Sequence, residues 1–599
     1  MKMNDVIKKV ELKKGLNKIE FDNFYSIGKI IAEKELKVRY FVGERETKIV
    51  RGVVYANKLE IDSPVKQQVS ILLGSGYLIN RDDEFTNKFS RFNKWSGGDG
   101  IYSFNIENGN DSFDQKDKKQ TLFVFGDTFY GRCDKQTYRR YEPLLMPNNS
   151  MAYYNPKSSE IDFRINRDPN DNSVIAFFNV DKRYDYEGVI PRELVSYDRN
   201  KKRFPWMSAY NDENIELKLD LFTIRRVTRI LLEPYTSEEH DKLSSRSAKE
   251  VKLLISNDDK TYKDLGNYFV GKDIEIEEEF RYLKIIIIKH EKEEQTYGLN
   301  KIYLYNNKQQ YKDIEITASS IFHKFKANRW LWLQDGVVIG EKLYFLPMII
   351  GPDTTQPEGL QFELVDVVLI SVPIKNGEVL YEKSKQKMAP VIADKGIVNY
   401  LMGGAIMANT VQSGSLNPDG YIYIYGFKTT YGLRDVIVAR VKEDRFEYFD
   451  DWKYYDGEKW VSDILESATL FTRCSCEFSV SEIREGENKG KFIGFFTDEV
   501  NSRYLGYVIG DSPVGPFSDP IIYYETPEKD IFKSTTYTYN SKAHPHLSDS
   551  KNILVSYNTN TYSFDHNMSD CRVYKPRFVR LKEIERWYYD DSRSQENKS

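Results

Sequence analysis

Short apolar runs that end in turn residues recur along the chain from residue 71 onward. Each run is rich in Ile, Val, Phe or Tyr and is followed by Gly, Asp or Asn, which is the pattern of β-strands bounded by turns. The clearest runs lie at 121–129, 342–350, 421–427, 491–499 and 552–560, and strand-like partners lie at 435–441, 504–510 and 577–581. Helical periodicity is nearly absent here, so the pattern predicts an all-β fold. Its grouping into about five sets favours a five-bladed β-propeller.

Two other stretches follow different patterns. Residues 1–70 are rich in Lys and Glu and alternate apolar with polar positions, which predicts a small N-terminal β-rich segment without assignable chemistry. Between 179 and 311 the spacing changes, and a stretch this long is uncommon as a plain loop. Its strand-like runs at 215–235, 251–266, 280–290 and 298–306 predict an inserted β-sandwich. We therefore expect the propeller in two parts, 71–178 and 312–590, and a polar tail at 591–599.

Composition adds aromatic surface and little net charge. Aromatic residues make up 14% of the chain, and 43 of them are Tyr. The apolar ring and polar tip of Tyr suit sugar binding, although the β propensity of Tyr explains the same usage. Lys and Arg number 87 against 91 Asp and Glu, a formal net charge of −4, and no long basic stripe occurs. Nucleic acid is therefore not an expected partner.

Cysteine usage and the chain start bear on the compartment. The four cysteines (Cys133, Cys474, Cys476 and Cys571) are few and irregularly spaced, so core thiols are expected rather than a disulfide framework or a metal site. No stretch reaches the ~18 apolar residues of a membrane span, and the first residues lack the apolar core of a secretory signal. The sequence as it stands predicts a cytoplasmic protein, or an extracellular one if a leader was removed. It carries no signal for an oligomeric state.

The inserted stretch resembles the discoidin, or coagulation-factor C-type, domain, which is widely used as a carbohydrate-binding module. The resemblance rests on Trp206, Leu219–Leu221, Ile255–Asp259, Arg281–Lys284 and Leu299–Tyr305, in that order. It implies ligand binding through loops at one end of a β-sandwich. A sandwich that only supports the propeller is the alternative.

The rest of the chain resembles a family of five-bladed propellers, long known as a domain of unknown function, whose members include endo-D-arabinanases. The matching motifs are Trp95–Ser103, Leu122–Gly131, Asn148–Ser150, Trp332–Val338, Tyr423–Gly426, Val438–Val441, Ser512–Phe517, Ala543–Leu547, Val555–Asn558 and Tyr574–Phe578. The resemblance implies a glycoside hydrolase that acts on furanose-containing polysaccharide such as D-arabinan. The segment between the first two motifs is longer than is usual in that family.

Asp99 and Asp127 are the candidate catalytic pair. Glycoside hydrolysis requires one carboxylic acid to protonate the leaving oxygen and a second carboxylate to activate water or attack carbon. Asp99 lies between two glycines, and Asp127 follows an apolar strand in a Gly-Asp-Thr turn. We expect both at the same rim of the propeller, with Asp99 as general base and Asp127 as general acid of an inverting reaction. The roles could be reversed, and both aspartates could instead only cap turns.

Further polar residues are candidates for substrate binding. Asp335 precedes a glycine at the start of a predicted blade, where it could modulate the pKa of the acid or hold a sugar hydroxyl. The two histidines of an Ala-His-Pro-His-Leu run would face one side of a strand and bond to sugar or to a carboxylate. Glu477 is a reserve candidate for a third acid. The full set of predicted substrate-binding residues is Asp335, Asn149, His544, His546, Tyr557, Asn558 and Arg577.

The sequence thus predicts a glycosidase without a cofactor, with polysaccharide or oligosaccharide as its partner and no metal in the site. A structural Ca²⁺ has no sequence signal for or against it. Two alternatives remain open: a non-catalytic lectin or adhesion protein on the same scaffold, and a hydrolase of another polysaccharide.

Overall fold

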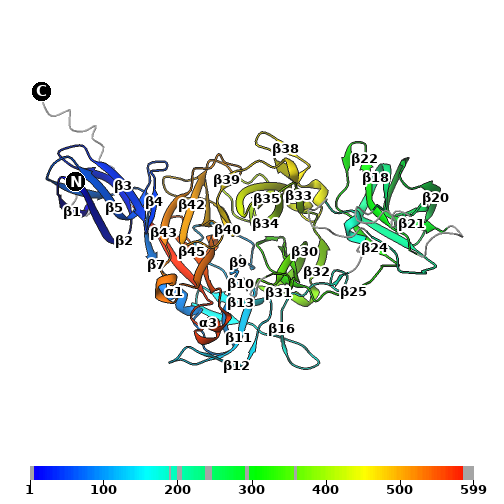
Figure 1. Ribbon diagram of the computed structural model, residues 1–599, viewed down its shortest axis with the longest axis horizontal. Coiled ribbons are helices and arrows are strands. Elements are labelled where there is room, and N and C mark those ends of the chain that lie inside the picture. Colours follow the sequence, from blue (N-terminus) through cyan, green and yellow to red (C-terminus); the bar gives the residue numbers. More distant parts are fainter. Residues whose placement is uncertain are drawn as a thin grey trace.

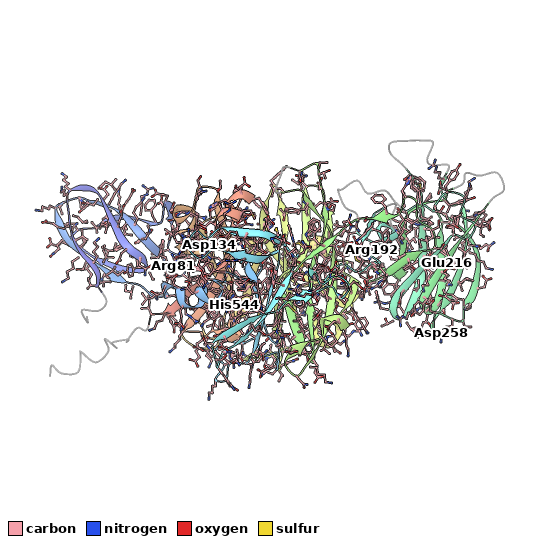
Figure 2. All side chains as sticks on the ribbon, turned by 90° about the horizontal axis from the view of Figure 1, so that it is seen from below. Arg81, Asp134, Arg192, Glu216, Asp258 and His544 are labelled. Carbon is pink, nitrogen blue, oxygen red and sulfur yellow. The ribbon has the colours of Figure 1, made fainter. Side chains whose placement is uncertain are left out.

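The computed structural model describes residues 6–187, 191–197, 206–236, 246–289, 296–356 and 360–584. These residues are nearly all in β-strands and their connections, as the sequence predicts. Within them the α-helices are short: α1 (Asp83–Lys88), α2 (Glu528–Ile531) and α3 (Phe564–Ser569). Single 3-10 turns span Pro191–Leu194, Tyr381–Lys383, Glu443–Arg445, Phe449–Asp451, Ile464–Glu466 and Pro545–Leu547. Figure 1 shows three parts in a row, an N-terminal unit, a central body and an inserted unit, and Figure 2 shows the same row from below.

The N-terminal unit is one six-stranded antiparallel sheet in the order β1-β6-β2-β5-β3-β4. Its strands are β1 (Val6–Leu12), β2 (Gly15–Ile31), β3 (Lys37–Val42), β4 (Arg45–Thr47), β5 (Tyr55–Ser63) and β6 (Gln67–Leu73). Alternate residues such as Leu59 and Ile61 are fully buried, which explains the period-two pattern. An ion pair between Arg45 and the buried Asp498 attaches this unit to the central body.

The central body contains five antiparallel sheets of four or more strands. The first sheet contains β9 (Tyr102–Asn105), β10 (Thr121–Phe125), β13 (Ser150–Asn155) and β14 (Glu160–Phe163), and the second contains β26 (Trp330–Trp332), β27 (Gly336–Ile339), β28 (Lys342–Phe345), β29 (Met348–Pro352), β30 (Phe362–Lys375), β31 (Glu378–Val379) and β32 (Lys385–Met388). The third sheet contains β33 (Ile392–Lys395), β34 (Val398–Asn409), β35 (Tyr421–Thr430), β36 (Leu433–Lys442), β37 (Lys453–Tyr455), β38 (Trp460–Val461) and β39 (Phe471–Thr472). The fourth contains β40 (Cys474–Glu482), β41 (Phe492–Asp498), β42 (Tyr504–Gly510) and β43 (Ile521–Glu525), and the fifth contains β44 (Thr536–Ala543), β45 (Asn552–Thr561) and β46 (Pro576–Glu583) together with β7 (Tyr77–Arg81). Smaller sheets are β8 (Trp95–Gly98) with β11 (Thr128–Cys133) and β12 (Arg140–Leu145), β15 (Asn166–Arg167) with β16 (Val174–Ile175), and β17 (Tyr186–Glu187) with β25 (Phe325–Lys326).

The five sheets follow one another along a closed path. One strand of each contacts the next sheet, β9 to β27, β27 to β34, β34 to β40 and β40 to β44. Ser103 Oγ on β9 and His544 Nδ1 directly after β44 lie 2.7 Å apart, so the path returns to the first sheet. The N-terminal strand β7 pairs with β46 and completes the last sheet, which ties the two ends of the body together. These five strands, β9, β27, β34, β40 and β44, are called the inner strands below.

The inserted unit has its own sheet and core. Its strands are β18 (Glu216–Pro234), β19 (Glu250–Ser256), β20 (Lys263–Phe269), β21 (Asp273–Ile288), β22 (Leu299–Asn306), β23 (Gln309–Gln310) and β24 (Glu315–Ala318). The predicted strands occur, and their alternate apolar residues are buried together. Arg281 donates two hydrogen bonds to the Asp220 carboxylate, at 2.8 and 2.9 Å, and the buried Trp206 indole donates to the Ser320 carbonyl oxygen at 3.0 Å.

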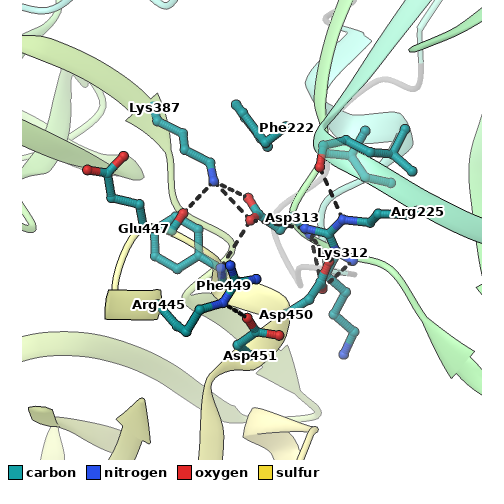
Figure 3. Close-up of polar contacts among 12 residues, drawn as sticks. Phe222, Arg225, Lys312, Asp313, Lys387, Arg445, Glu447, Phe449, Asp450 and Asp451 are labelled. Carbon is teal, nitrogen blue, oxygen red and sulfur yellow. Dashed lines mark hydrogen bonds and ion pairs between the residues drawn. The ribbon is translucent and has the colours of Figure 1, made fainter. Parts of the chain in front are cut away.

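A buried charge cluster joins the inserted unit to the central body (Figure 3). The Asp313 carboxylate is fully buried and lies 2.7 Å from the Lys387 ammonium and 3.6 Å from the Arg225 guanidinium. It also accepts the backbone N–H of Phe449 at 3.0 Å. Burial raises the pKa of Asp313 to about 6, although the Lys387 charge opposes this shift. Because the cluster draws on both units, it fixes the inserted unit against the body.

Several details differ from or extend the sequence expectations. The predicted strand at 342–350 is two strands, β28 and β29, interrupted at Leu346 and Pro347, since proline cannot donate to the ladder. All four cysteines are free thiols, and three of them are buried. Among the described residues, no helix is both long enough and apolar enough to cross a membrane. The predicted polar tail at 591–599 lies outside the described residues.

Candidate active site

Two adjoining turns hold Asp99 and Asp127 side by side. Asp99 lies between β8 and β9, and Asp127 lies between β10 and β11. The Gly126 amide donates a hydrogen bond to the Asp99 carbonyl oxygen at 2.9 Å, so the backbones of the two turns are joined directly. Both side chains are partly exposed and do not belong to the core. The structure therefore brings the two carboxylates predicted for catalysis to one solvent-accessible place.

Local backbone geometry explains why glycines flank both aspartates. A Cβ at Gly126 would lie 2.6 Å from Asp99 Oδ1, so only glycine leaves room for the Asp99 carboxylate there. Gly100 has φ +79° and Ile101 has φ +41°. A β-branched residue in the left-handed region is strained, and such strain is concentrated at functional sites. The backbone therefore turns sharply directly after Asp99.

Asp127 is held by two neutral donors. The Asn148 side-chain amide donates to Oδ1 and the Trp332 indole N–H donates to Oδ2, each at 3.2 Å. Burial raises the pKa of Asp127 to about 7, and the charge of Asp99 adds to the increase, while the two donors oppose it. A substantial fraction of the Asp127 carboxyl is therefore protonated near neutral pH.

Asp99 has donors that favour its ionised form. The Tyr539 hydroxyl donates to Asp99 Oδ2 at 2.7 Å. The Tyr574 hydroxyl donates to the Asp127 carbonyl oxygen at 3.1 Å and also acts on the Asp99 carboxylate. Burial raises the pKa of Asp99, but both tyrosine hydroxyls and the Lys542 ammonium lower it. The two aspartates therefore occupy different electrostatic environments, although they are neighbours.

A buried lysine links Asp99 to a third acid. Lys542 is only 2% exposed, and its ammonium group bonds both the Gly100 carbonyl oxygen and the Glu477 carboxylate. It also lies 4.1 Å from the centroid of the Tyr102 ring. Burial raises the pKa of Glu477, Lys542 opposes the shift, and the Asp99 charge adds to it. The reserve candidate Glu477 is therefore coupled electrostatically to Asp99.

β-Bulges position these side chains on the inner strands. The register shifts on β40 between Cys474 and Phe478, the stretch that contains Glu477, and on β44 between Tyr539 and Lys542. A third shift interrupts β34. A bulge breaks the strict alternation of side chains and commonly lies beside an active site. Tyr539 and Lys542 can therefore serve the same site although their spacing is odd.

Asp335 lies just before β27 and is also partly exposed. Its carboxylate accepts the backbone N–H groups of Gly336 at 2.8 Å and Ile406 at 2.7 Å. Burial raises the pKa of Asp335 to about 7. With Lys542 and His544 it lines a cavity of about 30 Å³ between the inner strands, which has room for water.

The two histidines serve inside the body. The His544 ring bonds Ser103 through Nδ1 at 2.7 Å and Ser556 through Nε2 at 2.9 Å, and it is only 1% exposed. His546 lies in the 3-10 turn Pro545–Leu547 instead of on a strand, since β44 ends at Ala543. The expectation that both histidines face one side of a strand is therefore wrong. Proline after the first histidine ends the ladder.

Asn149 is used within the fold. Its amide exchanges two hydrogen bonds with the backbone of Phe178, at 2.7 and 2.9 Å, and the residue is buried. The neighbouring Asn148 reaches Asp127 instead. Both asparagines lie in the connection between β12 and β13, so the path of this connection decides which of them reaches Asp127.

Tyr557, Arg577 and Asn558 also lie in the interior. The Tyr557 hydroxyl donates to both oxygens of the buried Glu528, at 3.0 and 3.1 Å, and Arg577 Nε lies 3.6 Å from the same carboxylate. Asn558 is fully buried beside Tyr539 in the β44–β45 ladder. In the described part of the chain its amide atoms have no hydrogen-bond partner. The structure does not bring Tyr557 and Arg577 to the two aspartates.

Sequence reasoning did not assign a role to five residues that surround the aspartates: Asn148, Trp332, Tyr539, Lys542 and Tyr574. Three of them lie inside the motifs quoted above, so the signal was present without a role attached. Lys542 had a signal of its own, as a single cation in an otherwise uncharged run. Across the described ranges, no three His, Cys, Asp or Glu side chains are grouped so as to hold a metal ion.

Solved structures that match the chain include one described as a hydrolase and two with glycan-related descriptions. A protein of Bacteroides ovatus ATCC 8483, provisionally assigned as a hydrolase, covers 84% of this chain and 90% of its own, with 16% identity and a TM-score of 0.46. The C-terminal domain of a Bacteroides fragilis chitobiase covers 22% of this chain and 99% of its own, with 12% identity and a TM-score of 0.17. A GH43 β-xylosidase/α-arabinofuranosidase from a compost microbial metagenome covers 43% and 92%, with 12% identity and a TM-score of 0.20. Similarity at this level supports no argument about function.

Sequence comparison gives a firmer relationship. No curated protein matches the chain. One family model matches residues 264–587, which is more than half of the chain and includes the second to fourth sheets and all of the fifth except β7, with Glu477 and Lys542. The match begins inside the inserted unit and leaves out the two turns that carry Asp99 and Asp127. The chain therefore belongs to the family described as "Domain of unknown function (DUF5005)".

Proposed function

We propose that this protein is a glycoside hydrolase whose active site lies at the mouth of a five-bladed β-propeller formed by the five sheets. One observation carries the proposal: two partly exposed carboxyl groups adjoin each other on joined turns, and one raises the pKa of the other. Turn-capping aspartates do not need this arrangement, because each would be satisfied within its own turn. Two carboxyl groups at one site, one protonated and one ionised, are what hydrolysis of a glycosidic bond requires.

Asp127 is the general acid and Asp99 the general base. An effective acid has a pKa near the working pH, and that of Asp127 is raised to about 7. Asp99 receives hydrogen bonds from Tyr539 and feels the charge of Lys542, which favour the carboxylate that a base must be. We propose inversion of the anomeric carbon, in which the base activates a water molecule.

Glu477 and Lys542 act as positioning residues. The lysine holds both the Glu477 carboxylate and the carbonyl oxygen of Gly100, next to the base. This contact fixes the turn that carries Asp99 and supplies positive charge beside it. Replacing Lys542 with Met should therefore raise the pKa of Asp99 and weaken the base.

The substrate class follows from the resemblance of the propeller motifs. We propose a furanose-containing polysaccharide, with D-arabinan as the first substrate to test. We propose that the inserted unit is discoidin-like and helps to hold the polymer. Its charge cluster at Asp313 would then keep the bound chain in a fixed position relative to the carboxylates.

Release of reducing sugar tests the proposal. Purified protein is incubated with D-arabinan and with a panel of other polysaccharides, and Asp99→Asn and Asp127→Asn serve as matched variants. We expect release by the wild-type protein and a loss of about 10²–10⁴-fold in each variant, the usual contribution of acid–base catalysis. If the wild-type protein releases no more sugar than the variants on every glycan, the protein is not a hydrolase. Glycan binding without release would favour the lectin alternative.

A further inference from the structure

We infer that a row of tyrosines running outward from Asp99 is a distal binding subsite for a glycan chain, with Tyr562 as its outer platform. This inference rests on the proposed function and defines the substrate as a polymer or long oligosaccharide.

The row begins at the candidate base. Tyr539 donates its hydroxyl to Asp99 Oδ2 at 2.7 Å. Its ring centroid lies 5.4 Å from that of Tyr537, two residues earlier on β44. The Tyr537 ring in turn lies 4.4 Å from the Tyr562 ring, with an interplanar angle of 31°. Three aromatic rings therefore connect the carboxylate to the end of β45 without a gap.

Exposure changes along the row. Tyr539 and Tyr537 are partly buried, whereas Tyr562 is 63% exposed. A single exposed ring is common on protein surfaces, but Tyr562 continues a row of rings that begins at Asp99, and this continuity is what indicates a binding surface. Its hydroxyl accepts a hydrogen bond from the Asn501 amide at 3.3 Å, which holds the ring in place.

A second row of rings starts at the candidate acid. Tyr574, which bonds the carbonyl oxygen of Asp127, packs edge-on against Phe129 with centroids 5.1 Å apart. Phe129 lies 6.3 Å from Phe564, which is 56% exposed and only two residues beyond Tyr562. Both rows thus reach solvent at the same edge, where α3 begins.

The chemistry fits a sugar chain better than a protein or a lipid. Aromatic rings offer a flat apolar face and, in tyrosine, a polar tip, which match the apolar faces and hydroxyl edges of sugar rings. The rows lead from two carboxyl groups whose pairing suits glycosidic cleavage. Because Tyr537 and Tyr539 lie between Asp99 and Tyr562, a sugar on Tyr562 is not the sugar at the carboxylates. A substrate that uses both places must have several units.

Affinity electrophoresis in the Asp127→Asn background tests the subsite without requiring cleavage. The protein is run in gels that contain D-arabinan, L-arabinan or xylan, and then again with Tyr562→Ala, Tyr562→Phe or Tyr431→Ala added. Tyr431 is the matched control because it is 86% exposed on the β35–β36 hairpin, in a different sheet. We expect one polymer to retard the parent, Tyr562→Ala to weaken binding about tenfold, which corresponds to roughly 1.4 kcal/mol, and the other two variants to change little.

The outcomes separate this inference from the proposed function. Retardation that depends on Tyr562 supports the subsite even if the wild-type protein cleaves nothing. If the wild-type protein cleaves a polymer but Tyr562→Ala leaves both its KM and its retardation unchanged, the subsite is refuted while the hydrolase stands. Equal weakening by Tyr431→Ala, or no retardation by any polymer, also refutes it.

Discussion

The indole hydrogen bond from Trp332 to Asp127 controls the pH range of activity in this account. Trp332→Phe removes a donor that stabilises the Asp127 carboxylate, so the pKa of Asp127 should increase further above about 7. Hydrogen bonds to charged groups contribute roughly 1.5–3 kcal/mol. Because Asp127 is partly exposed, the lower end applies, and at 1.36 kcal/mol per pKa unit it corresponds to an increase of about one unit.

The assay is the pH dependence of kcat/KM, which reports ionisations of the free enzyme. A general acid must be protonated, so activity decreases as the pH rises through its pKa, and Trp332→Phe should move that decrease to higher pH by about one unit. Trp330→Phe is the matched control, since the Trp330 indole is on the same strand and its N–H has no hydrogen-bond partner among the described residues. The assignment of Asp127 as the acid is refuted if the high-pH decrease of kcat/KM in Trp332→Phe stays at the same pH or moves to lower pH. It is also refuted if this decrease moves by the same amount in Trp330→Phe.

Three further predictions concern other parts of the structure. Asp313→Ala removes the carboxylate with which the buried Lys387 pairs and leaves Arg225 with Asp450 alone, at a cost of about 3–5 kcal/mol; limited proteolysis should then separate the inserted unit from the body, and an unchanged digestion pattern would contradict this. Gly126→Ala places a methyl group 2.6 Å from an Asp99 oxygen; activity should fall at least tenfold with an unchanged circular dichroism spectrum, and full activity would show that the carboxylate position is not critical. Arg577→Met breaks the buried pair with Glu528, so Tm should fall while KM of the surviving protein stays the same; a raised KM at unchanged Tm would place Arg577 in the binding site instead.

The strands and the aspartate pair were accessible from the sequence for a physical reason. Strands are short, apolar on at least one face and bounded by turn residues, so local pattern locates them without knowledge of the partner strand. Asp99 and Asp127 each lie in such a turn, beside glycines that backbone geometry requires. Local signals therefore marked both turns, and the resemblance to the propeller family singled out the two aspartates as candidates.

The surroundings of the pair depend on long-range register, which a local pattern does not specify. The Tyr539 hydroxyl reaches Asp99 across 440 residues, and the bulge between Tyr539 and Lys542 lets both serve one site. The Asn148 amide bonds Asp127, whereas the Asn149 amide bonds the backbone of Phe178, and both lie in the connection before β13, where no regular pattern fixes the direction of a side chain. Sequence analysis could name the motif but not the correct asparagine.

A substrate with a good leaving group provides the most direct test of the acid–base assignment. An aryl glycoside whose phenol leaves without protonation needs the base but not the acid. Asp127→Asn should therefore retain hydrolysis of the aryl glycoside within about tenfold while losing the polymer by at least about 10²-fold, and Asp99→Asn should lose both. Equal losses on both substrates in Asp127→Asn, or an active Asp99→Asn, would contradict the account.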